Sequence, residues 1–202
     1  YDPLNLDFDN RDKIVPRLRN RQWTGIDIAL TADLMPDLTP DLPIVAIGID
    51  RASNIAFPQK EVFKSSGLTI EQITERAIKY LISLNPKWED FGEEENMPKS
   101  LYHIGEYAAE QILNKQFLID ATKILKCTTI IISCVTNGRF MVTPLSSNKR
   151  DIYNFVTYNL LRYASHPSLR ISPVFFLANN TGTLFGVLGY SEELLETVQE
   201  FV

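Results

Sequence analysis

The sequence predicts an α+β fold: an antiparallel or mixed sheet built from three strand-turn-strand-helix units, with helices packed on it. Three observations lead to this prediction. The same order of β-rich run, turn, β-rich run and helical period occurs three times along the 202 residues. Asn137-Gly138, between two such runs, is the strongest short hairpin signal in the chain. The continuous apolar run at 129–132 is typical of a central strand covered on both faces.

Residues 1–41 are predicted to be an irregular N-terminal segment with short extended pieces at KIVPRLR and GIDIALT. The stretch DLMPDLTPDLP, residues 33–43, leads from this segment into the first unit and repeats the phrase Asp, Leu, any residue, Pro. Its prolines remove amide donors and favour extended backbone. Its aspartates lie roughly 13 Å apart in an extended chain, too far apart to share a metal. We therefore interpret it as a stiff lead-in to the first strand.

The first unit covers residues 42–85, with two strands in LPIVAIGIDRASNIAFP and a helix in TIEQITERAIKYLISL. Thr69 and Gln72 form a capping-box pattern at the start of this helix. Asn85-Pro86 is expected to end it. Residues 86–126 follow as an acidic, turn-rich loop and a helix from about Tyr102 to Leu125.

The second unit covers residues 127–166. Asn137-Gly138 is expected to form a type I′ turn, and Ser147 is expected to cap the helix NKRDIYNFVTYNLLRYAS. The third unit covers residues 171–202, with a turn at Asn179 to Gly182 and a closing helix opened by Ser191. The repeated pattern fits either an internal duplication or independent ββα units. The whole chain is predicted to form a single α+β domain.

Composition excludes several classes of protein. The net charge is −5 and the isoelectric point is near 5.1, whereas a nucleic-acid binder usually has a basic face. The longest apolar runs are far shorter than the roughly 20 residues of a membrane helix. Cys127 and Cys134 are interpreted as small buried side chains in a reducing cytoplasm. No oligomeric state is predicted.

Familiar motifs of catalysis and cofactor binding are absent from the sequence. There is no HExxH, CxxC, GxSxG, Walker-type loop or GxGxxG, so no cofactor, metal or catalytic residue is predicted. His166 is interpreted as a cap at the end of a helix, where a partly charged imidazole suits the helix dipole. His103 is placed in or beside the first turn of the helix at about 102–125, without a second metal ligand nearby.

Two sets of polar residues are candidates for ligand binding. The first is a basic run, Arg17, Arg19 and Arg21, whose alternate side chains would project from one face of an extended segment. It would either clamp an anion or protect a solvated strand edge, with the acidic loop as an internal partner. The second is a rim of hairpin turns, which would bind a small polar ligand if the turns align: Asp50, Arg51, Asn137, Arg139, Asn179 and Asn180. Backbone preferences of Asn and Asp in turns are the alternative explanation.

The stretches KIVPRLRN and DLPIVAIGIDRASNIAFPQKEVFKSSGLTIEQITERAIKYL resemble the bacterial YtpQ-like family of unknown function. YAAEQIL followed by IIISCVTNGRFMV is similar to a later helix-and-strand section of that family. The resemblance spans roughly residues 13 to 145. It implies a soluble bacterial protein and brings no established activity or catalytic residues.

Two functions follow as hypotheses. The first is a soluble cytoplasmic protein-interaction or regulatory module with a protein partner and no assignable reaction. The second is an enzyme or sensor that binds a small anionic ligand through the N-terminal arginines and the hairpin rim.

Overall fold

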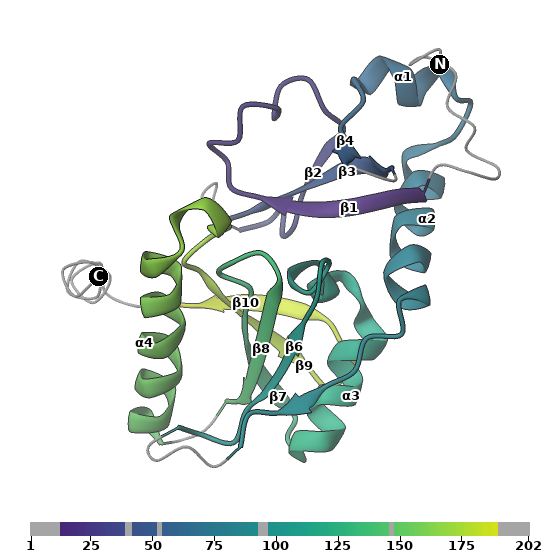
Figure 1. Ribbon diagram of the computed structural model, residues 1–202. Helices are drawn as coiled ribbons and strands as arrows, with labels where there is room; N and C mark the ends of the chain where they lie inside the picture. Colours follow the sequence, from purple (N-terminus) through teal and green to yellow (C-terminus); the bar gives the residue numbers. More distant parts are fainter. Residues whose placement is uncertain (1–12, 39–41, 52–53, 93–96, 146–147, 190–202) are drawn as a thin grey trace. The chain divides into compact units, whose positions relative to one another are not determined.

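The computed structural model describes residues 13–38, 42–51, 54–92, 97–145 and 148–189 (Figure 1). The chain divides into two compact units, Tyr1–Asn85 and Pro86–Val202. The α+β class is confirmed, and all strand pairs are antiparallel in the part of the chain that the structure describes. The strands form two sheets, one in each unit, rather than the one sheet predicted. The division falls after residue 85, the predicted end of the first strand-turn-strand-helix unit within the single predicted domain.

The first unit is built around strand β3, which has neighbours on both sides. Its apolar run is almost completely buried. β1 pairs with β3 along its whole length, and β2 and β4 also pair with β3, giving the order β1-β3-β2 with β4 off this path. The strands are β1 (Lys13–Arg19), β2 (Thr31–Asp33), β3 (Ile44–Asp50) and β4 (Ile55–Ala56). The extended piece predicted at KIVPRLR is confirmed as β1. GIDIALT is mostly turn, because its backbone folds back on itself through bonds such as Ala29 N–H to Gly25 O.

Two helices follow, α1 (Lys60–Ser65) and α2 (Ile70–Ser83). The capping box predicted at the start of α2 is confirmed: the Thr69 hydroxyl accepts from Gln72 N–H, and the Gln72 side chain accepts from Thr69 N–H. The helix ends before Asn85, which takes a left-handed conformation (φ 49°), and Pro86 cannot continue it. α2 packs along β1 with its apolar stripe buried.

The second unit contains a sheet in the order β10-β9-β7-β8-β6-β5. The central β7 is the apolar run that predicted a strand covered on both faces, and four of its five residues are buried. The strands are β5 (Glu89–Asp90), β6 (Leu101–Ile104), β7 (Thr129–Ser133), β8 (Arg139–Pro144), β9 (Phe175–Asn179) and β10 (Leu184–Leu188). The helices are η1 (Ala109–Leu113), α3 (Lys115–Leu125), α4 (Lys149–Ser165) and η2 (Pro167–Leu169).

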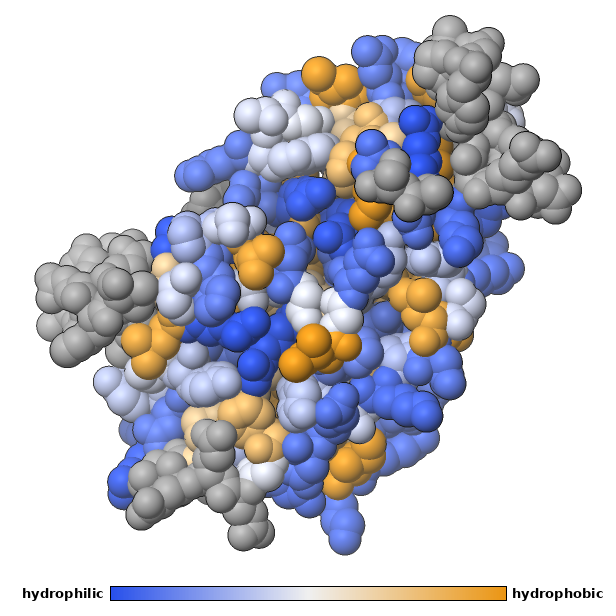
Figure 2. Space-filling model, in the orientation of Figure 1, coloured by the Kyte–Doolittle hydropathy of each residue, from blue (hydrophilic) through white to orange (hydrophobic). Residues whose placement is uncertain are grey.

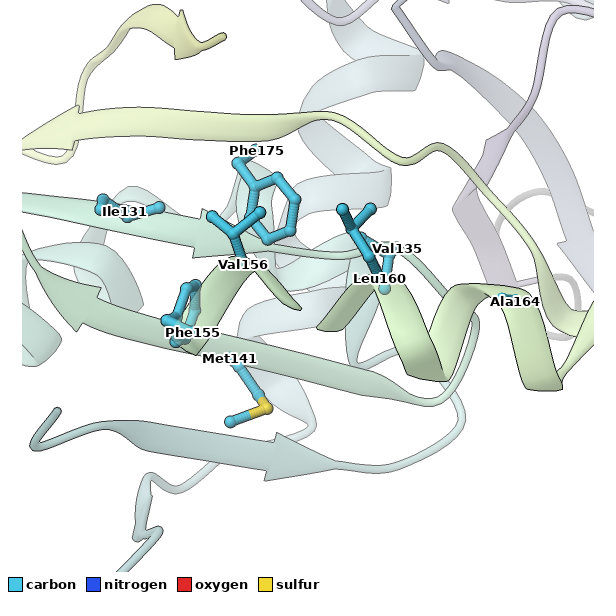
Figure 3. Close-up of a cluster of buried hydrophobic side chains, with 8 residues drawn as sticks. All are labelled: Ile131, Val135, Met141, Phe155, Val156, Leu160, Ala164 and Phe175. Carbon is cyan, nitrogen blue, oxygen red and sulfur yellow. The ribbon is translucent and has the colours of Figure 1, made fainter. Parts of the chain in front are cut away.

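Helices cover both faces of this sheet (Figure 1). On one face, α4 contributes half of a buried cluster that also draws on β7, β8 and β9 (Figure 3). On the other face, Phe140 of β8 lies near Phe117 of α3, with ring centroids 6.3 Å apart. The cluster under α4 consists of Ile131, Val135, Met141, Phe155, Val156, Leu160, Ala164 and Phe175. The apolar residues of each strand alternate between these two layers.

The helix predicted from about Tyr102 to Leu125 is wrong in its first half. Leu101–Ile104 forms strand β6, which pairs with β8, and the 3₁₀ helix η1 follows. The α-helix begins only at Lys115, where the Asn114 side chain accepts from Phe117 N–H. Pairing with β8 satisfies the β6 backbone, so tertiary contacts outweigh the local helical pattern. His103 therefore lies in a strand, and its predicted place in or beside a helical turn is wrong.

The predicted turn at Asn137-Gly138 also differs from the structure. Gly138 has a positive φ of 77°, but Asn137 does not, so this is not a type I′ turn. β7 ends at Ser133, and the longer connection is held by a bond from Asn137 N–H to Leu169 O. The cap of α4 is Asn148 rather than Ser147, because the Asn148 side chain accepts from Arg150 N–H.

The β9-β10 hairpin is antiparallel as predicted, and the helix expected after Ser191 lies outside the described residues. No helix within the described ranges is long and apolar enough to cross a membrane.

Candidate functional site

The predicted arginine run does not form one cluster. Arg17 and Arg19 lie on the same face of β1, as alternation requires, whereas Arg21 lies in the turn that follows. The Arg19 guanidinium lies over the rings of Trp23 and Phe57, at 5.6 and 5.1 Å from their centroids. Arg21 donates to Leu42 O at 3.1 Å and pairs with Asp33. Arg19 and Arg21 thus stabilise the first unit through internal contacts.

Asp50 and Arg51 lie where β3 ends and its turn begins. The Asp50 carboxylate accepts a hydrogen bond of 3.0 Å from the Tyr80 hydroxyl of α2. Lys13, opposite Asp50 in the β1-β3 register, lies over the Tyr80 ring at 5.5 Å. Arg51 N–H donates to Asn54 O across the turn. The Asp50 carboxylate and the Arg51 amide are therefore used to close the turn and to attach α2.

The hairpin turns of the second unit do not share a rim. Asn137 lies in the connection that follows β7, and Arg139 begins β8 directly after it. Asn179 and Asn180 belong to the turn that lies beside Thr129, where β7 begins. Because β7 and β9 are antiparallel, the two turns lie at opposite ends of the sheet.

The β9-β10 turn is explained by turn chemistry. The Asn179 side-chain oxygen accepts from Thr181 N–H, from the Thr181 hydroxyl and from Thr183 N–H, at 2.6–3.1 Å. Its side chain therefore holds the turn closed. Asn180 is exposed and borders a wide, open depression of about 620 Å³, which Lys123 and Lys126 also line.

Arg139 is a predicted site residue whose guanidinium contacts several aromatic side chains. It shares the face of β8 that carries Met141, and this face lies under α4. Its guanidinium lies 5.5–5.7 Å from the ring centroids of Phe91, Tyr102 and Tyr158. Arg139 Nη2 donates to the Tyr158 hydroxyl at 3.1 Å. Three aromatic rings thus fix the guanidinium without neutralising its charge.

Arg162 lies close to this group, and sequence reasoning missed it. It follows Tyr158 by one helical turn on α4, so the two side chains share one side of the helix. Burial, followed by the positive charge of Arg139, lowers the pKa of Arg162. Neither arginine forms an ion pair with a carboxylate among the residues that the structure describes. The i, i+4 spacing of Tyr158 and Arg162 was the available sequence signal.

Glu89 of β5 has a carboxylate near Arg139, but this carboxylate has another partner. Glu89 lies opposite Tyr102 in the β5-β6 register, and the Tyr102 hydroxyl donates to Glu89 Oε2 at 2.7 Å. This hydrogen bond is the main reason that the pKa of Tyr102 is raised. Glu89 therefore binds Tyr102, one of the rings around Arg139, rather than the guanidinium of Arg139 or Arg162.

The cysteines and histidines have structural environments. Both cysteines are free, and burial raises the pKa of each thiol, most strongly at Cys134, where the charge of Glu110 adds to the effect. His103 contacts Lys87 O through Nδ1 at 3.0 Å, and His166 contacts Arg162 O at the end of α4. Within the described ranges, no group of three His, Cys, Asp or Glu side chains is placed to bind a metal.

The edges of the two sheets differ in how they are protected. β1 carries Lys13, Pro16, Arg17 and Arg19, and the opposite edges of the two sheets are very short. β5 is also acidic. β10 is a five-residue edge strand, LFGVL, without charge or proline, and within the described residues it pairs with β9 alone. Its pairing shifts at Phe185, whose side chain is 51% exposed. Charges, prolines and short length are common ways to protect an edge, and β10 has none of these; the register shift at Phe185 is its one protective feature among the described residues.

The surface seen in Figure 2 is mainly hydrophilic, with hydrophobic residues in small separate patches between the described hydrophilic ones. The face seen in Figure 2 therefore offers no broad apolar surface for a partner protein, and the edge of β10 is the stronger candidate for partner binding. Comparisons with protein-family models, with curated proteins and with solved structures found no match for this chain. The resemblance to the YtpQ-like family, and the bacterial origin that it implies, stay predictions.

Proposed function

We propose that this chain is a cytoplasmic protein-interaction module that binds an extended segment of a partner protein at the edge of β10. The edge strand β10, which has no charge, no proline and no second neighbour within the described residues, carries the proposal. An extended peptide that adds a strand to an open edge gains main-chain hydrogen bonds, and side-chain contacts give specificity. Two free cysteines fit a reducing compartment and support the cytoplasmic part of the proposal.

Phe185 is the side chain best placed to anchor such a segment. It lies at the register shift of β10, so it is not matched with a residue of β9, and it is half exposed. Large aromatic residues dominate the energy of many interfaces. Leu188, at the end of the same strand, packs against the cluster under α4, which fixes the strand.

The test places a photo-crosslinking residue at position 185 in the native host and sequences the crosslinked peptides. Position 124 is the matched control, because Ile124 is a similarly exposed apolar side chain (46%) on helix α3 rather than on an edge strand. A synthetic peptide of the segment crosslinked at 185 is then titrated by fluorescence anisotropy. We expect it to bind the wild type, to slow amide exchange in β10, and to bind Phe185→Lys at least about tenfold more weakly, since the lysine adds an edge charge.

Two results would overturn the proposal. One is the same set of crosslinked peptides at positions 185 and 124. The other is a bound peptide that leaves amide exchange in β10 unchanged, because strand addition must protect that backbone. Ile124→Lys should bind the peptide as the wild type does.

A further inference from the structure

Arg139, Arg162 and Tyr158 form a group in the second unit, called the arginine group below, which brings together two charged side chains from different elements. Arg139 begins β8, and Arg162 lies in the last turn and a half of α4, which covers the same face of the sheet. Tyr158 connects them, since it receives a hydrogen bond from Arg139 and lies one helical turn before Arg162. The two guanidiniums are therefore held by a strand and a helix rather than by loops, which favours a fixed geometry.

The charge in this group is not compensated within the described part of the chain. Neither guanidinium has a carboxylate partner there. The buried Nε atoms of Arg139 and Arg162 have no hydrogen-bond acceptor among the described residues. Bringing like charges together at a half-buried site is unfavourable, and leaving buried donors unpaired adds a further cost. Both costs are removed when an anion binds.

The aromatic rings around Arg139 limit where an anion can reach its guanidinium. Phe91, Tyr102 and Tyr158 surround the Arg139 guanidinium, so its remaining donors are the part of the group left for a ligand. The Tyr158 oxygen accepts from Arg139, and its own proton is used in no described hydrogen bond. Two arginine forks and one hydroxyl donor are the groups that proteins use to bind phosphoryl oxygens.

We propose that Arg139, Arg162 and Tyr158 bind a doubly charged tetrahedral oxyanion of the phosphate-monoester class. The two positive charges match the charge of the dianion, whereas a carboxylate would compensate only one of them. This site lies on the α4 face of β8 and does not depend on strand addition at β10, so either proposal can fail without the other.

The experiment titrates the full chain with inorganic phosphate at constant ionic strength and follows the arginine Nε–Hε signals by NMR. We expect saturable shifts at Arg139 and Arg162, competition by sulfate, and about tenfold or weaker binding of acetate. Arg162→Gln should weaken phosphate binding about tenfold or more. Arg150→Gln, which removes the same charge from the first turn of α4, should bind phosphate as the wild type does.

Arg139→Lys is the second variant, because it removes the guanidinium and keeps a positive charge over the aromatic rings. We expect it also to weaken binding, since lysine has no planar fork. A phosphoserine peptide is titrated in parallel. If it binds more tightly than inorganic phosphate, the ligand of this site is a phosphorylated protein; if it binds more weakly, the ligand is a small phosphorylated molecule. Unchanged affinity in Arg162→Gln, acetate binding equal to that of phosphate, or no saturable shift would overturn the proposal.

Discussion

Gly182 offers the sharpest test of how the second unit is packed. It is buried in the β9-β10 turn with a φ of 70°. A Cβ at this position would lie 2.5 Å from Lys115 O and 3.1 Å from Lys115 Cα, at the start of α3. These are backbone atoms, which cannot rotate away as a flexible side chain can. Gly182→Ala should therefore strain the turn and also separate it from α3.

The size of the effect follows from two contributions. A left-handed conformation costs an alanine about 1–2 kcal/mol, and overpacking against fixed atoms costs about 1–3 kcal/mol. Gly182→Ala should thus lower the free energy of unfolding by about 2–5 kcal/mol. Gly92 has a φ of 85°, and a Cβ added there would meet nothing within 4 Å, so Gly92→Ala isolates the first contribution. Gly189, with open space and no positive φ, should tolerate alanine without loss.

Urea unfolding of the three variants gives the comparison. Trp88 is a suitable probe because it stacks on Phe117 of α3 with ring centroids 4.0 Å apart. Labelling with 5-fluorotryptophan separates its ¹⁹F signal from that of Trp23, which belongs to the other compact unit. If Gly182→Ala loses no more stability than Gly92→Ala, the contact with Lys115 does not constrain the turn and the reasoning is wrong.

Two further predictions concern a cap and a histidine. Thr69→Ala should lower the stability of α2 by about 1 kcal/mol, because it removes the acceptor of Gln72 N–H; an unchanged Trp23 unfolding transition would contradict this. Burial lowers the pKa of His103, so the unfolded chain binds more protons below its pKa of about 6.5. The free energy of unfolding should therefore fall as the pH decreases through that value towards the folded pKa. Urea midpoints measured against pH should fall less steeply in His103→Gln than in the wild type. Equal slopes of midpoint against pH in the two proteins would exclude His103 as the cause.

Local patterns predicted the elements whose signals are local. The capping box at Thr69 and the stop at Asn85-Pro86 require only neighbouring residues, and both are confirmed. The helix predicted from about Tyr102 to Leu125 failed in its first half because Leu101–Ile104 pairs with β8, a segment distant along the chain. A short segment with mixed periodicity is decided by such a partner and not by its own propensity.

In the candidate site, too, the sequence predicted what depends on neighbouring residues and missed what depends on distant ones. Arg139 was found because it follows a recognisable turn, but its role as a turn residue told nothing of its surroundings. Phe91, Tyr102 and Tyr158 come from three other segments, and only the sheet register and the position of α4 bring them together. The predicted rim failed for a related reason, since whether two turns meet depends on the strand order between them.

The edge at β10 follows from topology in the same way. LFGVL has the apolar composition that marks TIIIS as a central strand, and no local signal separates the two. In the folded chain, TIIIS has strands on both sides and is buried, whereas LFGVL has β9 on one side only. An apolar strand without charge gains most from a second neighbour, and within the described residues the second unit supplies none. This mismatch between composition and position is what makes β10, rather than the arginine-bearing β1, the edge at which a partner strand is expected.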